Sequence, residues 1–193
     1  PVAYSQGFHP SPRLSFGPPL NVGVGGLREY FDMELRAGCR IMNLREDLNQ
    51  ELPDGLRINE AVFVPESEPS LQRFITRYEY EIICPDASVT DYFLGLKSSI
   101  ITRQKSSGNY TTVDLRPMVE EATVIDDHTV KLVVRDTGED KVRLGELVPV
   151  MFKAPAEEFL ITRTSLFGWK NGWVEPLIIQ DAGCGTLDAR CTM

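Results

Sequence analysis

The sequence is poor in the residues that mark metal centres and membrane spans. It has only two histidines and four cysteines in 193 residues, and no two cysteines form a C-x-x-C pair. Zinc and iron–sulfur sites usually need such close pairs, so no metal site is expected. No apolar run approaches the roughly 18 residues of a membrane-spanning helix, and no signal-peptide pattern is present. No membrane partner is therefore expected.

The chain also has fewer positively charged than negatively charged residues. The chain has 20 Lys and Arg against 28 Asp and Glu, which gives a formal net charge of −8. An acidic surface does not attract phosphate backbones overall, so RNA binding would need a local basic patch or a basic segment outside this chain. The glycine-rich run from Asn21 to Gly26 lacks a G-x-x-x-x-G-K-[ST] pattern. We interpret it as a flexible turn rather than a phosphate cradle, and we expect no cofactor.

The cysteines favour a reduced, cytoplasmic setting. They are Cys39, Cys84, Cys184 and Cys191, and six residues separate the last two. That spacing leaves a disulfide or a weak metal site open. The favoured interpretation is that both are unpaired thiols on a loose C-terminal tail at residues 181–193.

Aromatic, glycine, proline, histidine and arginine residues are concentrated in one short window, from Tyr4 to Leu20. Proline fixes φ and glycine permits positive φ, so the backbone there is closely shaped without regular structure. Loops that carry chemistry often have this composition. We therefore expect the window to fold back and build a rigid recognition surface.

Five residues of this window are candidates for a substrate-binding site. His9 can act as acid, base or ligand near neutral pH, or it can hydrogen-bond its own loop. Arg13 can hold an anionic group through its planar fork, or it can pair with an acid of the scaffold. Ser5, Gln6 and Ser15 can add hydrogen bonds to a ligand.

Charged pairs on expected strands are weaker candidates. Asp114 and Arg116 lie two positions apart on an expected strand, so both would point to one face and line a cleft. Solvated or paired charges are the favoured interpretation there. Asp32 and Glu34 share a strand face in the same way, and a metal site that they form with His9 is a less favoured alternative.

Two aromatic residues near the end of the chain are interpreted as structural. Trp169 and Trp173 flank a turn at Lys170-Asn171-Gly172. Two aromatics on such a hairpin are more often a packing clamp than a platform for nucleic-acid bases.

The hydrophobic pattern predicts an α+β chain. Expected strands cover residues 29–35, 56–64, 77–84, 100–105, 110–115, 121–125, 129–135 and 159–167. Expected helices cover residues 43–52, 90–97 and 144–152, where Asn43 is a plausible N-cap and Pro149 predicts a kink or an early end. A polar, proline-containing stretch at 66–70 reads as a linker. We therefore expect one unit at residues 1–68 and another at 69–180.

The order of these elements is compatible with two tandem ferredoxin-like units, each a split βαβ. The second half gives β-α-β-β-α-β if its two hairpins are merged into long strands. The first half lacks the leading strand and helix of that order. Because the leading strand is a central one, its loss would strip hydrogen bonds from two neighbours. Either the missing residues lie outside this sequence, or another segment fills the gap, or the assignment is wrong.

The opening motif PVAYSQGFHPSPRLSFGPPLNVGV, followed by EYFDMEL, resembles the radical-SAM-linked protein family. Proteins of this family carry a domain of unknown function, alone or fused behind a radical-SAM enzyme. Weaker matches are LNQELPDGLRI, VDLRP and ITRTSLF, and the similarity extends to about residue 179.

In such relatives a strand and a Leu-rich helix precede the motif, and many carry His where this chain has Ser11. The resemblance implies association with radical-SAM chemistry, with RNA modification as a context, but it supplies no reaction. This chain has no C-x₃-C-x₂-C run for the iron–sulfur cluster of that chemistry.

Three functions remain open at this point. The favoured one is an accessory module that binds RNA, or another substrate, for a radical-SAM enzyme. The second is a protein–protein scaffold on that enzyme, whose exposed sheet edge can also drive self-association. The third is an enzyme that uses His9 and Arg13 in acid–base chemistry on RNA, although the absent second histidine weakens it. An independent enzyme is therefore not the favoured reading.

Overall fold

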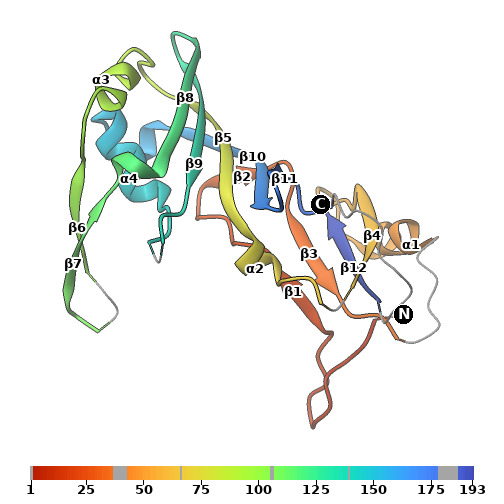
Figure 1. The fold of residues 1–193 in the computed structure, drawn as a ribbon. Helices are drawn as coiled ribbons and strands as arrows, with labels where there is room; N and C mark the ends of the chain where they lie inside the picture. Colours follow the sequence, from red (N-terminus) through yellow and green to blue (C-terminus); the bar gives the residue numbers. More distant parts are fainter. Residues whose placement is uncertain (1, 37–42, 66, 105–106, 139, 178–186) are drawn as a thin grey trace. The chain divides into compact units, whose positions relative to one another are not determined.

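The protein is strand-rich, with four α-helices among the described residues. A computed structural model describes residues 2–36, 43–65, 67–104, 107–138, 140–177 and 187–193 (Figure 1). Within these ranges the α+β class expected from the sequence is confirmed. No helix in the described part of the chain is long and apolar enough to cross a membrane.

The chain divides into two compact units, and each is assembled from segments that are distant in the sequence. Unit 1 comprises Pro1–Pro19, Leu27–Thr76 and Leu166–Met193, whereas unit 2 comprises Leu20–Gly26 and Arg77–Ser165. These bounds differ from the expected units at 1–68 and 69–180. Composition reveals a polar linker, but it does not reveal which distant strands pair with one another.

Unit 1 contains a four-stranded antiparallel sheet in the order β1-β3-β12-β4 (Figure 1). Its elements are β1 (Leu14–Phe16), β3 (Tyr30–Met33), α1 (Leu44–Glu51), β4 (Glu60–Pro65), α2 (Leu71–Phe74), β11 (Trp173–Val174) and β12 (Leu187–Thr192). The elements expected at 29–35, 43–52 and 56–64 correspond to β3, α1 and β4. Asn43 precedes α1, but its side chain makes no capping hydrogen bond.

The expected loose tail at residues 181–193 contains a central strand instead. β12 lies between β3 and β4 and pairs antiparallel with both. Its Cys191 is fully buried in a core cluster with Phe31, Met33, Leu44 and Ile58, whereas Cys184 lies outside the described residues. Apolar and polar residues alternate in LDARCT, which is the signal that marks a strand. The glycines just before it conceal that signal by suggesting a tail.

Arg190 of β12 is a buried charge in unit 1. It is 2% exposed, and its guanidinium donates to Asp32 from Nε to Oδ1 at 2.7 Å and from Nη2 to Oδ2 at 3.2 Å. It also donates to the carbonyls of Pro176 at 3.2 Å and Pro69 at 3.4 Å. A buried guanidinium is tolerated only with such partners. Asp32 is therefore the counter-ion of β12 and is not grouped with His9.

We expect unit 1 to lose stability in alkaline solution. Burial, with a smaller contribution from the charge of Asp32, raises the pKa of Cys191 from 9.0 to about 12. Burial likewise raises the pKa of Tyr30 from 10.0 to about 12. Both groups hold their proton more tightly in the folded chain. Their stabilisation is complete below the unfolded pKa and disappears as the pH rises through the folded pKa, hence between about pH 9 and 12.

Urea unfolding followed by tryptophan fluorescence measures this loss, because both tryptophans, Trp169 and Trp173, belong to unit 1. Cys191→Ala should lose less stability than the wild type between neutral pH and about pH 10.5. Cys84→Ala in unit 2 is the matched control: burial also raises the pKa of Cys84, but the tryptophans report on unit 1, whose unfolding should therefore follow the wild type. Identical pH dependence of the wild type and Cys191→Ala would contradict the expectation.

Unit 2 is built on strands in the order β10-β5-β9-β8, and β2 pairs parallel with β10. Its elements are β2 (Val24–Gly26), β5 (Ile75–Ile83), α3 (Thr90–Leu94), β6 (Ile100–Gln104), β7 (Tyr110–Asp114), the 3-10 turn η2 (Arg116–Met118), β8 (Val119–Asp126), β9 (Thr129–Arg135), α4 (Leu144–Phe152), the 3-10 turn η3 (Ala156–Glu158) and β10 (Leu160–Trp169). The first two residues of β5 and the part of β10 from Leu166 onward are assigned to unit 1. The glycine-rich run begins with a turn at Val22 and Gly23, as expected, but its last three residues form β2. Pro149 does not end α4 early.

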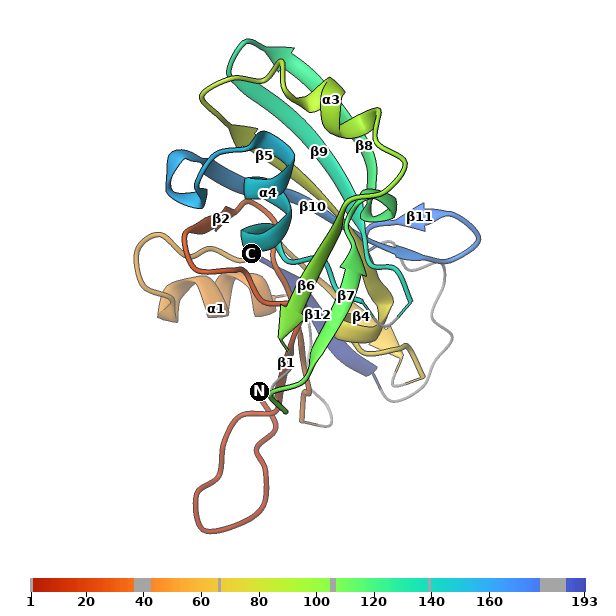
Figure 2. The same cartoon turned by 90° about the vertical axis from the view of Figure 1, so that its left-hand side faces the viewer.

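Both hairpins expected in the second half are present, but they are not merged into long strands. β8 and β9 belong to the larger sheet, whereas β6 and β7 form a two-stranded sheet of their own (Figure 2). Each hairpin closes on its own turn, at Gly108 or at Asp127 and His128, but neither turn determines whether its hairpin joins the larger sheet.

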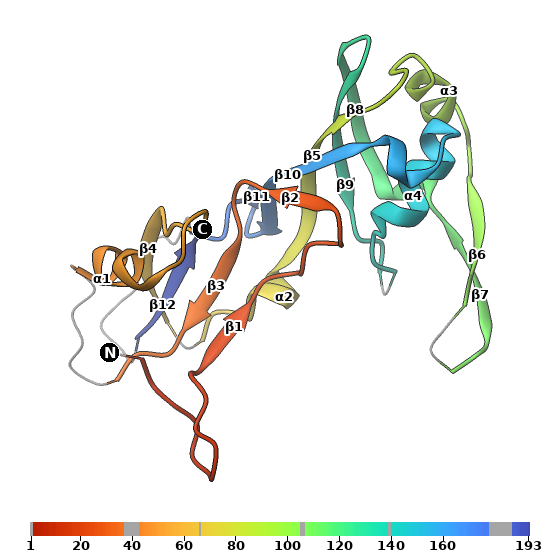
Figure 3. The same ribbon diagram turned by 180° about the vertical axis from the view of Figure 1, so that it is seen from behind.

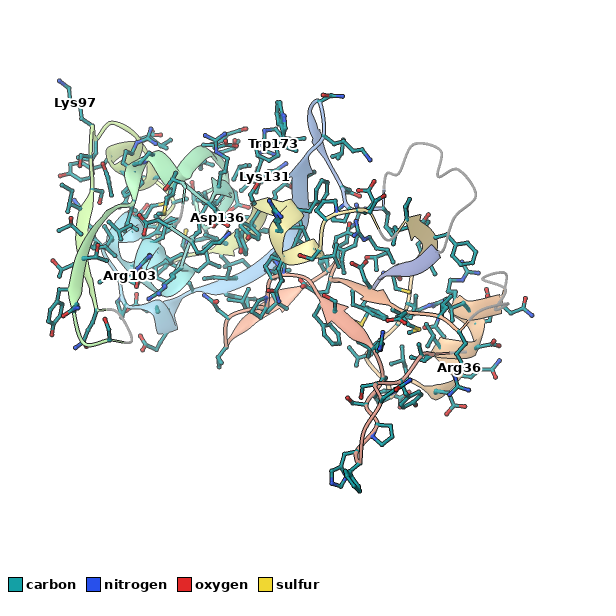
Figure 4. The ribbon with its side chains drawn as sticks, turned by 60° about the horizontal axis from the view of Figure 1, so that its bottom comes forward. Arg36, Lys97, Arg103, Lys131, Asp136 and Trp173 are labelled. Carbon is teal, nitrogen blue, oxygen red and sulfur yellow. The ribbon has the colours of Figure 1, made fainter. Side chains whose placement is uncertain are left out.

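A buried ion pair attaches the β6–β7 hairpin to α4 (Figure 4). Arg103 of β6 is 7% exposed and donates to Glu146 Oε2 from Nε at 3.0 Å and from Nη2 at 2.7 Å. It also donates to the carbonyl of Lys141 at 3.3 Å and lies 3.5 Å from Asp140. Glu146 stands in the first turn of α4. Arg103 therefore links the hairpin to α4.

Candidate functional site

The opening motif forms a projecting loop, which we call the opening arm (residues 4–12). Its two ends meet at a β-bridge between Tyr4 and Pro12. Inside that bridge, the Ser5 amide donates to the Ser11 carbonyl at 2.9 Å, and the Ser11 amide donates to Ser5 Oγ at 3.0 Å. The two hydroxyls lie 3.2 Å apart. Ser5, a predicted site residue, therefore closes the base of the arm.

The arm is joined to the sheet of unit 1 by a short hydrogen-bond ladder. The Ala3 amide donates to the Glu34 carbonyl at 2.8 Å, and the Arg13 amide donates to the Ala3 carbonyl at 2.9 Å. The Glu34 amide in turn donates to the Arg13 carbonyl at 3.1 Å. Beyond this ladder the arm extends away from β1 (Figure 3). It does not fold back over the sheet, which corrects the expectation from its prolines and glycines.

The tip of the arm is open to solvent. All of residues 6–16 are exposed, and Phe8 is completely so. Gly7 adopts φ 140°, a conformation that favours glycine. Among the described residues, neither His9 nor Gln6 has a side-chain hydrogen-bond partner, and the same holds for Ser15. These three predicted residues are therefore accessible, although no common ligand geometry brings them together.

Of the two roles that the sequence left open for Arg13, the structure shows pairing with an acid of the protein itself. Its Nη1 donates to Glu34 Oε1 at 3.0 Å and to Oε2 at 2.7 Å, and both side chains are about half exposed. The hydrogen bond to Glu34, and then its charge, raise the pKa of the Arg13 guanidinium. Glu34 is thus engaged by Arg13 rather than by His9. In the described part of the chain, no three His, Cys, Asp or Glu residues are grouped as a metal site would require.

Asp114 and Arg116 shape a turn in unit 2. Asp114 ends β7, but Arg116 begins η2, so they do not share a strand face as expected. The Asp114 carboxylate accepts from the amides of Ser99 at 2.7 Å and Arg116 at 3.1 Å, which lowers its pKa. The Arg116 guanidinium donates to the carbonyls of Leu94 at 3.0 Å and Val119 at 2.9 Å. Their groups are therefore occupied in joining α3, β7 and β8.

A buried carboxylate in unit 2, that of Asp136, likewise has its oxygens occupied by hydrogen-bond donors. Asp136 accepts from Tyr78 Oη at 3.2 Å, from Lys141 Nζ at 2.9 Å and from the Val142 amide at 2.9 Å (Figure 4). Burial, and then the charge of Asp136, raise the pKa of Tyr78. The Asp136 carboxylate is therefore occupied by three donors, and sequence reasoning did not single it out because Tyr78 lies 58 residues away in the chain.

Two hollows lie elsewhere on the described surface. One of about 660 Å³ lies over the end of α1 and carries both signs of charge, from Arg45, Arg57, Glu46 and Asp54. Another of about 440 Å³ is mainly apolar and lies beside α4 and η3 in unit 2. None of the seven predicted site residues lines either hollow.

The two tryptophans pack as the clamp interpretation expects. The rings of Trp169 and Trp173 meet edge to face, with centroids 5.2 Å apart and planes at 81°. The turn between them places Asn171 at φ 57°. This edge-to-face contact lies within unit 1, and Trp169 remains 63% exposed.

Residues 6–12 of the arm all face solvent, and His9 is the one acid–base candidate that the sequence singled out there. General acid–base chemistry at a phosphodiester needs an acid and a base together. Arg13 is already bound to Glu34. The geometry of the arm therefore supports contact with a partner better than proton transfer.

A family model described as "Uncharacterized protein conserved in bacteria (DUF2344)" matches residues 1–144 of the 193. The matched residues include the opening arm, Asp114 and Arg116, and they end at the start of α4. A search of curated proteins and a search of solved structures each found no match. The chain therefore belongs to this bacterial DUF2344 family.

Proposed function

We propose that the chain is an accessory module that binds a radical-SAM enzyme through the opening arm. The exposure of the arm carries this proposal. Phe8 at its tip is completely exposed, and Leu14 and Phe16 beside its base are 38% and 53% exposed. Apolar side chains gathered on one exposed segment are typical of an interaction surface. The identity of the partner rests on the resemblance of the opening motif to radical-SAM-linked proteins.

The construction of the arm supports a binding role. The Ser5–Ser11 hydrogen bonds and the Tyr4–Pro12 bridge hold its two legs together without any partner. Pro10 and Pro12 restrict φ on the second leg. Such preorganisation lowers the entropy that must be lost when a loop docks.

The charge balance favours a protein partner over RNA. The chain carries a net charge of −8, and Arg13, the arginine next to the arm, is neutralised by Glu34. Binding to a phosphate backbone depends on unpaired Lys and Arg that displace counter-ions. RNA, which the family resemblance also suggests, is therefore the alternative ligand and becomes an outcome of the test.

We also propose that both units are variants of the ferredoxin-like split βαβ. In that fold the first and third strands are central, and the second and fourth lie at the edges. The order β10-β5-β9-β8 supports this for unit 2, with the β6–β7 hairpin inserted after α3. The order β1-β3-β12-β4 supports it for unit 1, with β12 in the position of the leading strand. Antiparallel pairing of β12 with both neighbours agrees with that position.

Replacing Phe8 and His9 by alanine together should weaken binding of a radical-SAM enzyme from the same organism by tenfold or more. One aromatic anchor at the centre of an interface commonly contributes at least about 1.4 kcal/mol, which corresponds to tenfold in affinity. Biolayer interferometry with the full chain measures the affinity. Tyr110→Ala in unit 2 is the matched control, because Tyr110 is 68% exposed and lies outside the arm.

Unchanged affinity in the Phe8→Ala, His9→Ala variant would exclude the arm as the contact. Absence of binding by the wild type would exclude the enzyme as the partner. A parallel titration with structured RNA at low salt decides the alternative. RNA binding that falls steeply with salt and is lost in the same variant would assign the arm to RNA instead.

A further inference from the structure

We propose that the space between β3 and β4 is a strand-binding site that accepts β12 from a second copy of the chain as well as its own. The site belongs to unit 1 and does not involve the tip of the opening arm. Failure of this inference would leave the proposed role of the arm unaffected, and the converse also holds.

The backbone of β12 is engaged on both sides. β12 pairs with Glu60–Pro65 of β4 on one side and with Tyr30–Met33 of β3 on the other. Beyond the strand, Met193 and Glu29 exchange backbone hydrogen bonds at 2.7 and 3.0 Å, and the Asn59 amide donates to the Thr192 carbonyl at 2.8 Å. Without β12, two neighbouring strands would each present an unpaired edge. Such edges are templates for a strand from any source.

The side chains around the space select which strand fits. Asp32 offers both carboxylate oxygens to a guanidinium, and Arg190 is the residue that takes them. On the opposite face, the small side chain of Cys191 is fully buried in the core beside Phe31 and Met33, where overpacking is destabilising. The site therefore takes an antiparallel strand with an arginine followed by a small apolar residue. β12 has this pattern in its Arg190-Cys191 pair.

The position of β12 in the chain makes donation between copies feasible. β3 and β4 lie within residues 30–65, whereas β12 lies at residues 187–192. The nine residues 178–186 that precede it can span about 30 Å when fully extended. Because its own chain holds it nearby, β12 competes for the space with an effective concentration in the millimolar range. A strand from a second copy competes when the protein concentration approaches that range. Exchange of an identical element between copies is a low-cost route to a dimer.

A disulfide trap reports which copy supplies β12. Ala61 of β4 is the cross-strand partner of Cys191 and packs against the same core cluster. In a chain with Cys39, Cys84 and Cys184 replaced by serine, Ala61→Cys and Cys191 are the two remaining cysteines, and peptide mass mapping of the dimer band separates a 61–191 bond from 61–61 and 191–191 bonds. Refolding at increasing concentration, followed by oxidation and non-reducing electrophoresis, separates bonds within a chain from bonds between chains. The same background without Ala61→Cys is the control.

We expect the bond to form within one chain in dilute solution. The share of covalent dimer should rise about tenfold between roughly 0.05 and 1 mM protein. A disulfide confined to single chains at every concentration would overturn donation between copies. Absence of any Ala61→Cys to Cys191 bond would overturn the site itself.

A second measurement does not depend on that cysteine pair. A protease site is inserted within residues 178–186 of the full chain, and cleavage leaves β12 held without a covalent link. A fluorescent peptide of residues 187–193 should then replace it, as followed by fluorescence anisotropy. The Arg190→Ala peptide should bind at least tenfold more weakly, because it leaves Asp32 unpaired. No incorporation of the unmodified peptide, or equal binding of both peptides, would overturn the proposal.

Discussion

Replacing Arg190 by alanine is expected to lower the free energy of unfolding of unit 1 by about 3–5 kcal/mol. Arg190 is 2% exposed, and four acceptor oxygens from Asp32, Pro176 and Pro69 surround its guanidinium. The substitution leaves Asp32, whose side chain is only 17% exposed, without its counter-ion. It also opens a cavity beside the central strand. Urea unfolding followed by tryptophan fluorescence measures the effect.

The matched control is Arg13→Ala in the same unit. Arg13 also makes two hydrogen bonds to one carboxylate, but its side chain is 50% exposed and water can replace Glu34. Its loss should change the unfolding midpoint little. A double-mutant cycle with Asp32→Ala isolates the buried pair. Equal effects of Arg190→Ala and Arg13→Ala would show that β12 is not held by a buried charge.

Replacing Arg103 by methionine is expected to destabilise unit 2 by about 3 kcal/mol. The change removes the guanidinium that joins β6 to Glu146 at 2.7 Å and to the Lys141 carbonyl at 3.3 Å. We place the effect at the lower end of the range for a broken buried pair, because Glu146 is 27% exposed and keeps its contact with Arg143. Methionine also retains part of the packing of the aliphatic stem.

Hydrogen exchange at individual amides separates this effect from general unfolding. The amides of β6 and β7 should exchange at least tenfold faster in Arg103→Met, whereas those of β9 should change less. Arg143→Met is the control, since the Arg143 side chain is 54% exposed and contacts the same carboxylate from outside. Uniform acceleration across unit 2, or none in the hairpin, would contradict the assigned role of Arg103.

Local elements of the fold were predictable because their signals lie within short windows. The alternation in residues 77–84 predicts β5, in which Tyr78, Tyr80 and Ile82 are buried as one face. The turn at Ser107-Gly108-Asn109 predicts the β6–β7 hairpin. The same reasoning did not separate this hairpin from the larger sheet, because a turn specifies which strands are adjacent but not what else they pair with.

The candidate site was predictable as a segment but not as a set of contacts. The prolines, glycines and aromatics of the opening motif predict an irregular loop, and the structure contains an irregular, exposed loop at residues 4–12. Whether Arg13 would bind a ligand or an acid of the scaffold depends on Glu34, which is 21 residues away. No local pattern connects the two, and the same holds for Asp32 with Arg190.

By itself, the amino-acid sequence determined the acidic charge, the α+β class, most helices and strands, and the location of the exposed motif. Each of these follows from composition or from the spacing of neighbouring residues. Only the tertiary structure decided that the arm projects, that Arg13 and Asp32 are paired, and that the last strand fills the centre of a sheet. These outcomes depend on contacts between distant segments. There, the free energy gained by pairing a buried charge or by covering a strand edge exceeds the local conformational preferences.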